Sequence, residues 1–210
     1  MEGSLQGKWR RPGREALLLL YVPVYLMLFM AAERLITADY WVSWCALDDA
    51  IPFVKEFVFA YVLWYPMAIC AALWLLAQDG RAFVRYALLM IASLTACIAI
   101  FFLLPSGQEL RPAAVEGSGL AALLVRAIYA ADTNTNVFPS MHVAGTLAAL
   151  AGLWDSDTVG SCARWGSTLL GLCIILSTLF IKQHSALDVI SGIALFLVIH
   201  PVIYLFPGRK

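Results

Sequence analysis

Long uninterrupted apolar runs constrain the fold of this 210-residue chain more than any other feature. A helix needs about 20 mostly apolar residues to cross a bilayer. Six runs are candidates for such helices, at about 16–32, 57–76, 86–104, 142–154, 166–181 and 187–206. The run 142–154 is short, so its neighbours must extend it or the bilayer must thin around it. Because the runs lack the two-residue alternation of a membrane β-barrel, we expect an all-α bundle of six transmembrane helices.

Composition supports this membrane class and excludes others. Hydrophobic residues make up 62% of the chain and charged residues only 13%, against about 25% charged residues in a soluble domain. The formal net charge is +0, so no excess of basic residues is present to hold a nucleic acid. We find no linker or repeat, which predicts one membrane domain over 1–210, with an N-terminal tail at 1–14 and core motifs within 106–192. None of the five cysteines has C-x-x-C spacing, so neither a zinc site nor a disulfide framework is expected.

The basic residues predict the orientation of the chain. With the N-terminus in the cytoplasm, nine lysines and arginines fall on the inner side and five on the outer side. The N-terminal Lys8, Arg10, Arg11 and Arg14 supply much of this bias, and Arg209 and Lys210 add to it. Both termini are then cytoplasmic, and segments 106–141 and 182–186 meet on the outer side. Short loops favour a bacterial cytoplasmic membrane.

The segment 136–145, NVFPSMHVAG, contains the first unusual polar residues. Ser140 precedes an apolar run and is typical of a helix N-cap. The free backbone N–H groups of such a helix start bind anions. His142, on the first turn, could donate a proton to an oxygen that leaves the anion. A capped helix that merely carries an interfacial histidine is equally compatible with this segment.

The segment 177–192 contains the second set of unusual residues. His184 and Asp188 are four residues apart and would share one helix face. The carboxylate would then accept the proton of one ring nitrogen and leave the other nitrogen as a nucleophile. Alternatively, Asp188 only caps the helix, because Ser185 to Asp188 form an S-x-x-D capping pattern.

Other polar residues have less certain roles. The fork of Arg111 suits two phosphate oxygens, although a lone arginine at the end of a span usually anchors the interface. Asp48 and Asp49 are interpreted as a solvated loop. Asn134 and Asn136 either shape their loop or contact a headgroup. The segment 118–131 predicts an amphipathic helix that lies in the interface or packs on the bundle.

These features together suit phosphoryl transfer through a phosphohistidine. They are a nitrogen nucleophile with a carboxylate partner, a histidine that can act as a general acid on an anion-binding helix start, and an arginine clamp. No carboxylate cluster accompanies the histidines, so no metal or other cofactor is expected. A transporter or a haem-binding membrane protein that uses the same histidines is a remote alternative.

These motifs resemble those of the type 2 phosphatidic acid phosphatase and vanadium haloperoxidase superfamily. The sequence from Pro139 to His142 is similar to its P-S-G-H motif. His184 with Asp188 is similar to the end of S-R-x5-H-x3-D, and Arg111 with Pro112 to the end of K-x6-R-P.

The resemblance implies a role for each matching residue. His184 is the nucleophile, Asp188 orients it, and His142 is the general acid for the leaving alcohol and later the base for water. Arg111, the hydroxyl of Ser140 and the backbone N–H of Met141 hold phosphate oxygens. The family works without a metal. The matching residues His142, His184, Asp188 and Arg111 then imply a lipid-phosphate phosphatase, such as one for phosphatidic acid or a polyprenyl phosphate.

Three positions depart from the motifs: Leu104 replaces a lysine, Thr178 an arginine and Met141 a glycine. Two cationic clamps are therefore missing, and Lys182 is a candidate for one of them. The aliphatic Met141 and the K-Q-H-x-x-x-D pattern are similar to the inositol phosphorylceramide synthase branch. That resemblance implies a second candidate, a transferase that moves a phospho-headgroup to a lipid alcohol.

Overall fold

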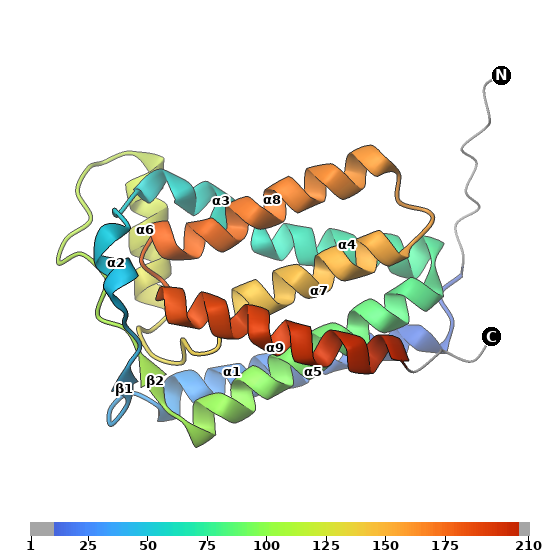
Figure 1. Ribbon diagram of the computed structural model, residues 1–210, viewed down its shortest axis with the longest axis horizontal. Coiled ribbons are helices and arrows are strands. Elements are labelled where there is room, and N and C mark those ends of the chain that lie inside the picture. The colour runs from blue at the N-terminus through green and yellow to red at the C-terminus, as the bar shows by residue number, and fades with distance from the viewer. Residues whose placement is uncertain (1–10, 206–210) are drawn as a thin grey trace.

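The computed structural model describes residues 11–205, which form an elongated bundle of helices (Figure 1). Lys8, Arg10, Arg209 and Lys210, which contribute to the predicted orientation, lie outside the described residues. The elements in chain order are η1 Arg14–Leu20, α1 Tyr21–Leu35, β1 Trp41–Val42, α2 Ala46–Ala50, η2 Lys55–Phe57, α3 Val58–Val62, α4 Trp64–Gln78, α5 Gly80–Leu103, β2 Ser106–Gly107, α6 Leu120–Ala131, α7 Met141–Asp155, α8 Ser161–Phe180 and α9 Ala186–Leu205.

Five helical segments are long and apolar enough to cross a membrane: Arg14–Leu35, Lys55–Gln78, Gly80–Leu103, Ser161–Phe180 and Ala186–Leu205. They match five of the six predicted runs and indicate an integral membrane protein. The sixth run forms α7, which has only 15 residues because it begins after the Ser140 cap and ends at Asp155. The mostly helical fold is therefore confirmed, whereas the count of six spans is not.

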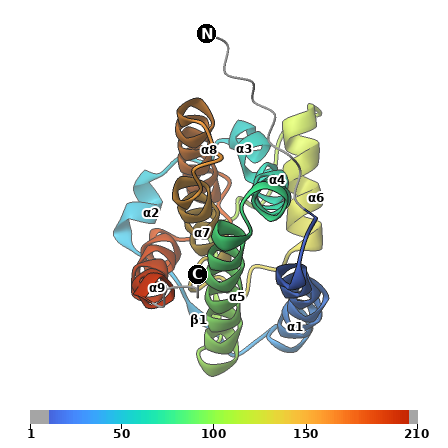
Figure 2. The ribbon, with the colours of Figure 1, turned by 90° about the vertical axis from the view of Figure 1, so that its right-hand side faces the viewer.

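Helix α7 is the centre of the bundle. It packs against α4, α5, α8 and α9, and the end-on view shows it among these helices (Figure 2). Small buried residues on α7, including Ala144, Ala148 and Gly152, allow this close approach. A Cβ atom on Gly145 would lie only 2.8 Å from the ring of Trp64 in α4. The small side chains of α7 therefore hold its N-terminus, which carries the serine motif, deep in the protein.

One end of the bundle, here called the loop end, gathers α2, α6 and the two short strands (Figure 1). Strand β1 pairs in parallel with β2, with Trp41 opposite Ser106. The predicted amphipathic helix at 118–131 is confirmed as α6, which packs on η2 and α3. Leu120 and Leu123 stay exposed on its outer face. The loop end also carries the starts of α7 and α9, and with them both histidine motifs.

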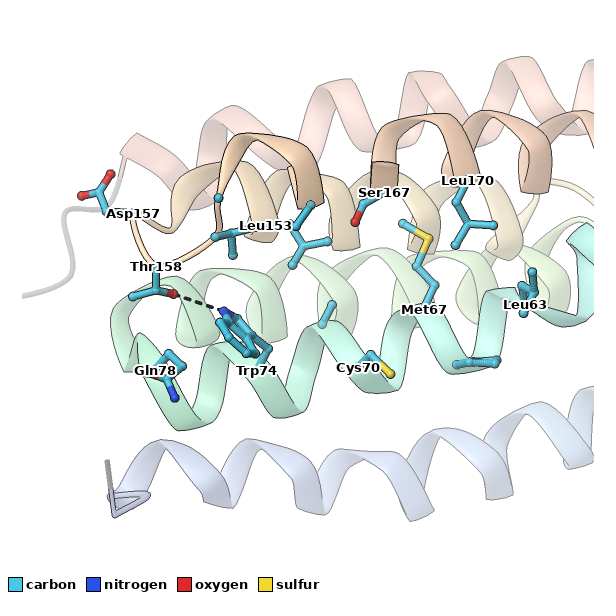
Figure 3. A pocket seen from close by; sticks show the side chains of 15 residues that line it. Leu63, Met67, Cys70, Trp74, Gln78, Leu153, Asp157, Thr158, Ser167 and Leu170 are labelled. Atoms are coloured by element: carbon cyan, nitrogen blue, oxygen red, sulfur yellow. Dashed lines mark hydrogen bonds between the residues drawn. The ribbon is translucent and has the colours of Figure 1, made fainter. Parts of the chain in front are cut away.

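An apolar groove of about 970 Å³ lies between α4 and α8, away from the loop end (Figure 3). Leu63, Met67, Leu153 and Leu170 are among its lining residues. At its far end the indole N–H of Trp74 donates to the hydroxyl of Thr158 at 3.3 Å. None of the predicted site residues lines this groove, so the groove is separate from the candidate site.

Candidate active site

The two histidine motifs meet at the loop end. The ring centroids of His142, on the first turn of α7, and His184, just before α9, are 5.7 Å apart. The two rings are therefore neighbours, which a reaction that uses both histidines on one phosphate requires. Tyr61 and Trp64 also contact the His142 ring, with centroid distances of 4.5 and 5.0 Å. Aromatic rings thus fix the plane of the imidazole.

Nε2 of His142 is buried and has no hydrogen-bond partner among residues 11–205. A buried polar atom without a partner costs roughly 1–3 kcal/mol, so proteins rarely keep one without a use. The atom belongs to the ring that faces His184. A ligand oxygen within hydrogen-bond distance of Nε2 would satisfy it.

Nδ1 of His184 has two acceptors within reach. The carbonyl oxygen of Val137 lies at 3.1 Å and Oδ2 of Asp188 at 3.5 Å. Both favour a proton on Nδ1, which leaves the lone pair of Nε2 for chemistry. The sequence analysis identified Asp188 but not Val137. The acceptor at Val137 is a backbone carbonyl, which every residue type carries, so the sequence does not single it out.

Asp188 makes the predicted capping interaction. Its role as the proton acceptor of His184 stays a prediction, because its Oδ2 lies 3.5 Å from Nδ1 and the hydrogen bond of that nitrogen is to the Val137 carbonyl. Its Oδ2 accepts the backbone N–H of Ser185 at 2.8 Å, which is the capping interaction. Its Oδ1 accepts the hydroxyl of Ser43 at 2.6 Å, and its side chain is fully buried. Its backbone carbonyl also accepts the N–H of Ser140 at 3.0 Å. Asp188 therefore joins the two histidine motifs directly.

The interpretation of Asp48 and Asp49 as a solvated loop is wrong for Asp48. Its side chain is buried, and its oxygens accept the Ser185 hydroxyl at 2.6 Å and the Ala186 N–H at 2.8 Å. It caps the start of α9 from another part of the chain. Its neighbour Asp49 is exposed, as expected, and accepts the indole N–H of Trp44.

Ser140 is the N-cap of α7, as its position predicts. Its hydroxyl accepts the backbone N–H of Val143 at a long 3.4 Å, and the residue is fully buried. Met141 is also buried, and its sulfur contacts the hydroxyl of Tyr25 at 3.9 Å. The start of α7, with the backbone N–H groups of Met141 and His142, therefore lies beside the histidines.

Arg111 reaches the site region but is largely occupied. Its two terminal nitrogens donate to the carbonyls of Tyr129, Asp132 and Thr133 and to Oε1 of Gln183, the last at 2.6 Å. Its guanidinium also covers the Tyr129 ring at 4.4 Å. Nε has no partner within the described part of the chain. In this arrangement the guanidinium offers a phosphate one free N–H rather than a fork.

Lys182 is turned toward α2. Its ammonium group donates to the carbonyls of Asp48 at 2.8 Å and Ile51 at 2.6 Å. A phosphate would have to displace these two bonds to use its charge, so the role of Lys182 as a phosphate ligand stays a prediction. The two positions at which the motifs have a cation bring no charge here. Leu104 is half exposed after α5, and the hydroxyl of Thr178 donates to the Ile175 carbonyl.

Asp132, which the sequence analysis did not identify, lies beside the candidate site. Its Oδ2 accepts the side-chain N–H of Gln183 at 3.2 Å, next to His184. Burial and the neighbouring Glu33 raise the pKa of Asp132 to about 6, while His184 and Arg111 act in the opposite direction. The residue stands at the end of an amphipathic helix, where a solvated aspartate is common, so nothing in the sequence marked it.

The apolar helices and the paired histidines define an integral-membrane protein with a candidate phosphoryl-transfer site. The chain belongs to the PAP2 superfamily, because the model of that family matches residues 27–202. Members of this superfamily are typically phosphatases or phosphotransferases, which fits the site. The chain matches no curated protein and no solved structure.

Proposed function

We propose that this chain is a lipid-phosphate phosphatase that acts through a phosphohistidine, without a metal, on the outer face of a bacterial cytoplasmic membrane. One observation carries the proposal: the rings of His142 and His184 lie 5.7 Å apart, and Nε2 of His142 is buried without a partner among the described residues. A phosphate that contacts both histidines at the edge of the pair gives Nε2 of His142 and Nε2 of His184 a partner. Phosphatidic acid and polyprenyl phosphates are the substrates of this class that we would test first.

The first step uses the histidines in different protonation states. The lone pair of His184 Nε2 attacks phosphorus, while the bond between phosphorus and the leaving alcohol oxygen breaks. The electron pair of that bond goes to the alcohol oxygen, which takes a proton from His142. Asp188 and the Val137 carbonyl stabilise the imidazolium that forms at His184.

The second step returns the enzyme to its starting state. Water attacks the phosphohistidine and gives its proton to His142, and the phosphorus–nitrogen bond breaks in favour of His184. The N–H groups at the start of α7, including that of Met141, and the remaining N–H of Arg111 would hold the phosphate oxygens. The Ser140 hydroxyl would add a further hydrogen bond.

The test is phosphate release by the purified protein in detergent or nanodiscs, with a chelator present. Wild-type protein should release phosphate from phosphatidic acid, and orthovanadate should inhibit because it mimics five-coordinate phosphorus. His184→Ala should abolish release. The matched control is His200→Ala, since His200 stacks on Tyr204 in α9 and is not part of the site. Full activity of His184→Ala would exclude the mechanism.

A second candidate, a transferase of the inositol phosphorylceramide synthase kind, is favoured by the small number of free cations. Arg111 and Lys182 are engaged with protein oxygens, and positions 104 and 178 are uncharged. A phospholipid donor supplied with a lipid alcohol separates the two candidates. Free phosphate as the sole product indicates the phosphatase, and a new phosphodiester indicates the transferase.

A further inference from the structure

The segment 132–140, which connects α6 to α7, carries one backbone atom of the candidate site. The carbonyl oxygen of Val137 lies 3.1 Å from Nδ1 of His184. A carbonyl oxygen can only accept a hydrogen bond, so this contact requires the proton on Nδ1 and leaves the lone pair on Nε2. The position of Val137 therefore bears on whether His184 can act as a nucleophile.

Glu33, near the end of α1, anchors this segment at two points. Its Oε1 accepts the side-chain N–H of Asn136, the residue before Val137, at 2.7 Å. Its Oε2 accepts the backbone N–H of Thr133 at 3.0 Å and the hydroxyl of Thr133 at 2.6 Å. Three donors of the segment therefore converge on one carboxyl group, which lies 100 residues before Thr133 in the chain.

The backbone at Asn136 has a conformation that few residues adopt. Its φ is +58°, in the left-handed region, where only a few per cent of residues other than glycine are found and where asparagine is enriched. Asn136 is only 5% exposed, and its backbone N–H donates to the Ser106 carbonyl at 2.7 Å. Side chain and backbone of Asn136 are thus both held in place, and Val137 follows directly.

The other anchored residue, Thr133, contacts the candidate phosphate-binding arginine. Its carbonyl oxygen accepts a hydrogen bond from Nη2 of Arg111 at 2.7 Å. Glu33 therefore anchors the segment at the contact to Arg111 as well as next to the contact to His184. None of the described interactions joins Glu33 to a histidine ring, so its effect on His184 has to pass through the segment.

We infer that Glu33 is a positioning residue for the candidate nucleophile. Through Asn136 it keeps the Val137 carbonyl on Nδ1 of His184, and it thereby fixes the tautomer whose Nε2 is free. The inference rests on the proposed function, because this tautomer serves the attack of Nε2 on phosphorus. It gives a role at the site to α1, which lies outside the segment 106–192 that contains the motifs. Without this contact, the tautomer with its proton on Nε2 becomes populated, and that tautomer has no lone pair on Nε2.

The test reads the tautomer directly, by nitrogen NMR of the imidazole rings in protein that contains isotope-labelled histidine. The chain has three histidines, so single substitutions by alanine assign every ring. In alkaline buffer, wild-type His184 should carry its proton on Nδ1. Glu33→Gln replaces one acceptor oxygen with an N–H donor, and it should shift the tautomer ratio of His184 about fivefold toward Nε2–H. It should also lower kcat for phosphate release by about 10- to 100-fold, with a smaller change in KM.

A second substitution tests the contact from its other side and offers a rescue. Asn136→Asp removes the donor to Glu33 but keeps a residue type that tolerates the left-handed backbone. It should shift the tautomer as Glu33→Gln does, and it carries the test alone if Glu33→Gln does not fold. The two substitutions combined exchange donor and acceptor, because the introduced amide can donate to the introduced carboxylate. The double variant should therefore restore the Nδ1 tautomer and most of kcat.

The matched control is Asp79→Asn, between α4 and α5 at the opposite end of the bundle (Figure 1). Its carboxylate accepts the Ala82 N–H and the Ser156 hydroxyl, so the change should lower the unfolding temperature without altering the His184 tautomer. An unchanged tautomer in the single variants, or a double variant as impaired as they are, would overturn the inference. The NMR measurement needs no substrate. Absence of phosphate release by wild type, or turnover by His184→Ala, would instead overturn the proposed function.

Discussion

Asp48 and Ser185 are 137 residues apart in the chain, yet their side chains are joined by a buried hydrogen bond of 2.6 Å. The same carboxylate accepts the backbone N–H of Ala186 at 2.8 Å. Since Ser185 directly follows His184, this contact fixes the backbone that carries the candidate nucleophile. Helix α2 therefore supports the site without contacting the two histidine rings in any described interaction.

The first prediction concerns Asp48→Ala. The change leaves the Ser185 hydroxyl and the Ala186 N–H without their acceptor, at a cost of roughly 1–3 kcal/mol for buried donors. We expect a lower unfolding temperature in detergent and a loss of activity. Asp49→Ala is the matched control, because Asp49 is exposed and pairs only with Trp44 in the described contacts. Equal stability of the two variants would contradict the assigned role of Asp48.

The second prediction concerns Gly192, where α9 passes the start of α7. A Cβ atom at this position would lie 2.8 Å from the Ser140 carbonyl and 3.0 Å from Cβ of Val143. Gly192→Ala should push the two histidine motifs apart, destabilise the protein by about 1–3 kcal/mol and lower kcat.

Gly166 in α8 provides the control for this substitution. A Cβ atom there has nothing within 4 Å. Gly166→Ala should therefore be neutral, or stabilising by roughly 0.5–1 kcal/mol through helix propensity. Thermal unfolding and phosphate release, measured in parallel on both variants, check the pair. An unimpaired Gly192→Ala variant would show that this close approach is not needed.

The third prediction concerns Asp188→Asn. The amide still fits the buried position but no longer stabilises a positive charge on His184, while the Val137 carbonyl continues to accept the proton of Nδ1. We expect kcat to fall by about 10²- to 10⁴-fold, with a smaller effect on KM. His184→Ala should be lower still. Steady-state kinetics decides, and a change in KM alone would mean that Asp188 acts only in binding.

The fourth prediction concerns pH and stability. The pKa of Asp132 is about 6 in the folded protein against an ordinary 3.8, so the folded state binds this proton more tightly than the unfolded state. The resulting stabilisation is present below the ordinary value and is lost as the pH rises through about 6. Asp132→Asn removes this dependence. The unfolding temperature of the variant, relative to wild type, should therefore increase between about pH 4 and 7. A constant difference would contradict the burial of the Asp132 carboxylate.

Much of the site could be predicted because it depends on local spacing. Ser140 as the N-cap and His142 on the first turn of α7 follow from helix geometry. The prediction that His184 and Asp188 share one helix face is wrong, because α9 begins at Ala186, after His184. The two side chains are nevertheless 3.5 Å apart. The proximity of the two histidine motifs was expected because the predicted topology puts both segments at the same end of the bundle.

The missed features depend on tertiary contacts. The burial of Asp48 arises from its bonds to Ser185 and Ala186, and the orientation of Lys182 from carbonyls of the α2 region. The acceptor of His184 at Val137 is a backbone atom, on which the residue type has no bearing. Helix α7 is shorter than a full span because it begins after the Ser140 cap and ends at Asp155.

The most direct test of the account is to trap the covalent intermediate. Wild-type protein is mixed with a lipid phosphate labelled on phosphorus, quenched in alkali to preserve phosphohistidine, and mapped by mass spectrometry of its peptides. We predict a label on His184 that is absent from His184→Ala and retained in Asp49→Asn. A label on any other residue, or steady turnover by His184→Ala, would contradict the account.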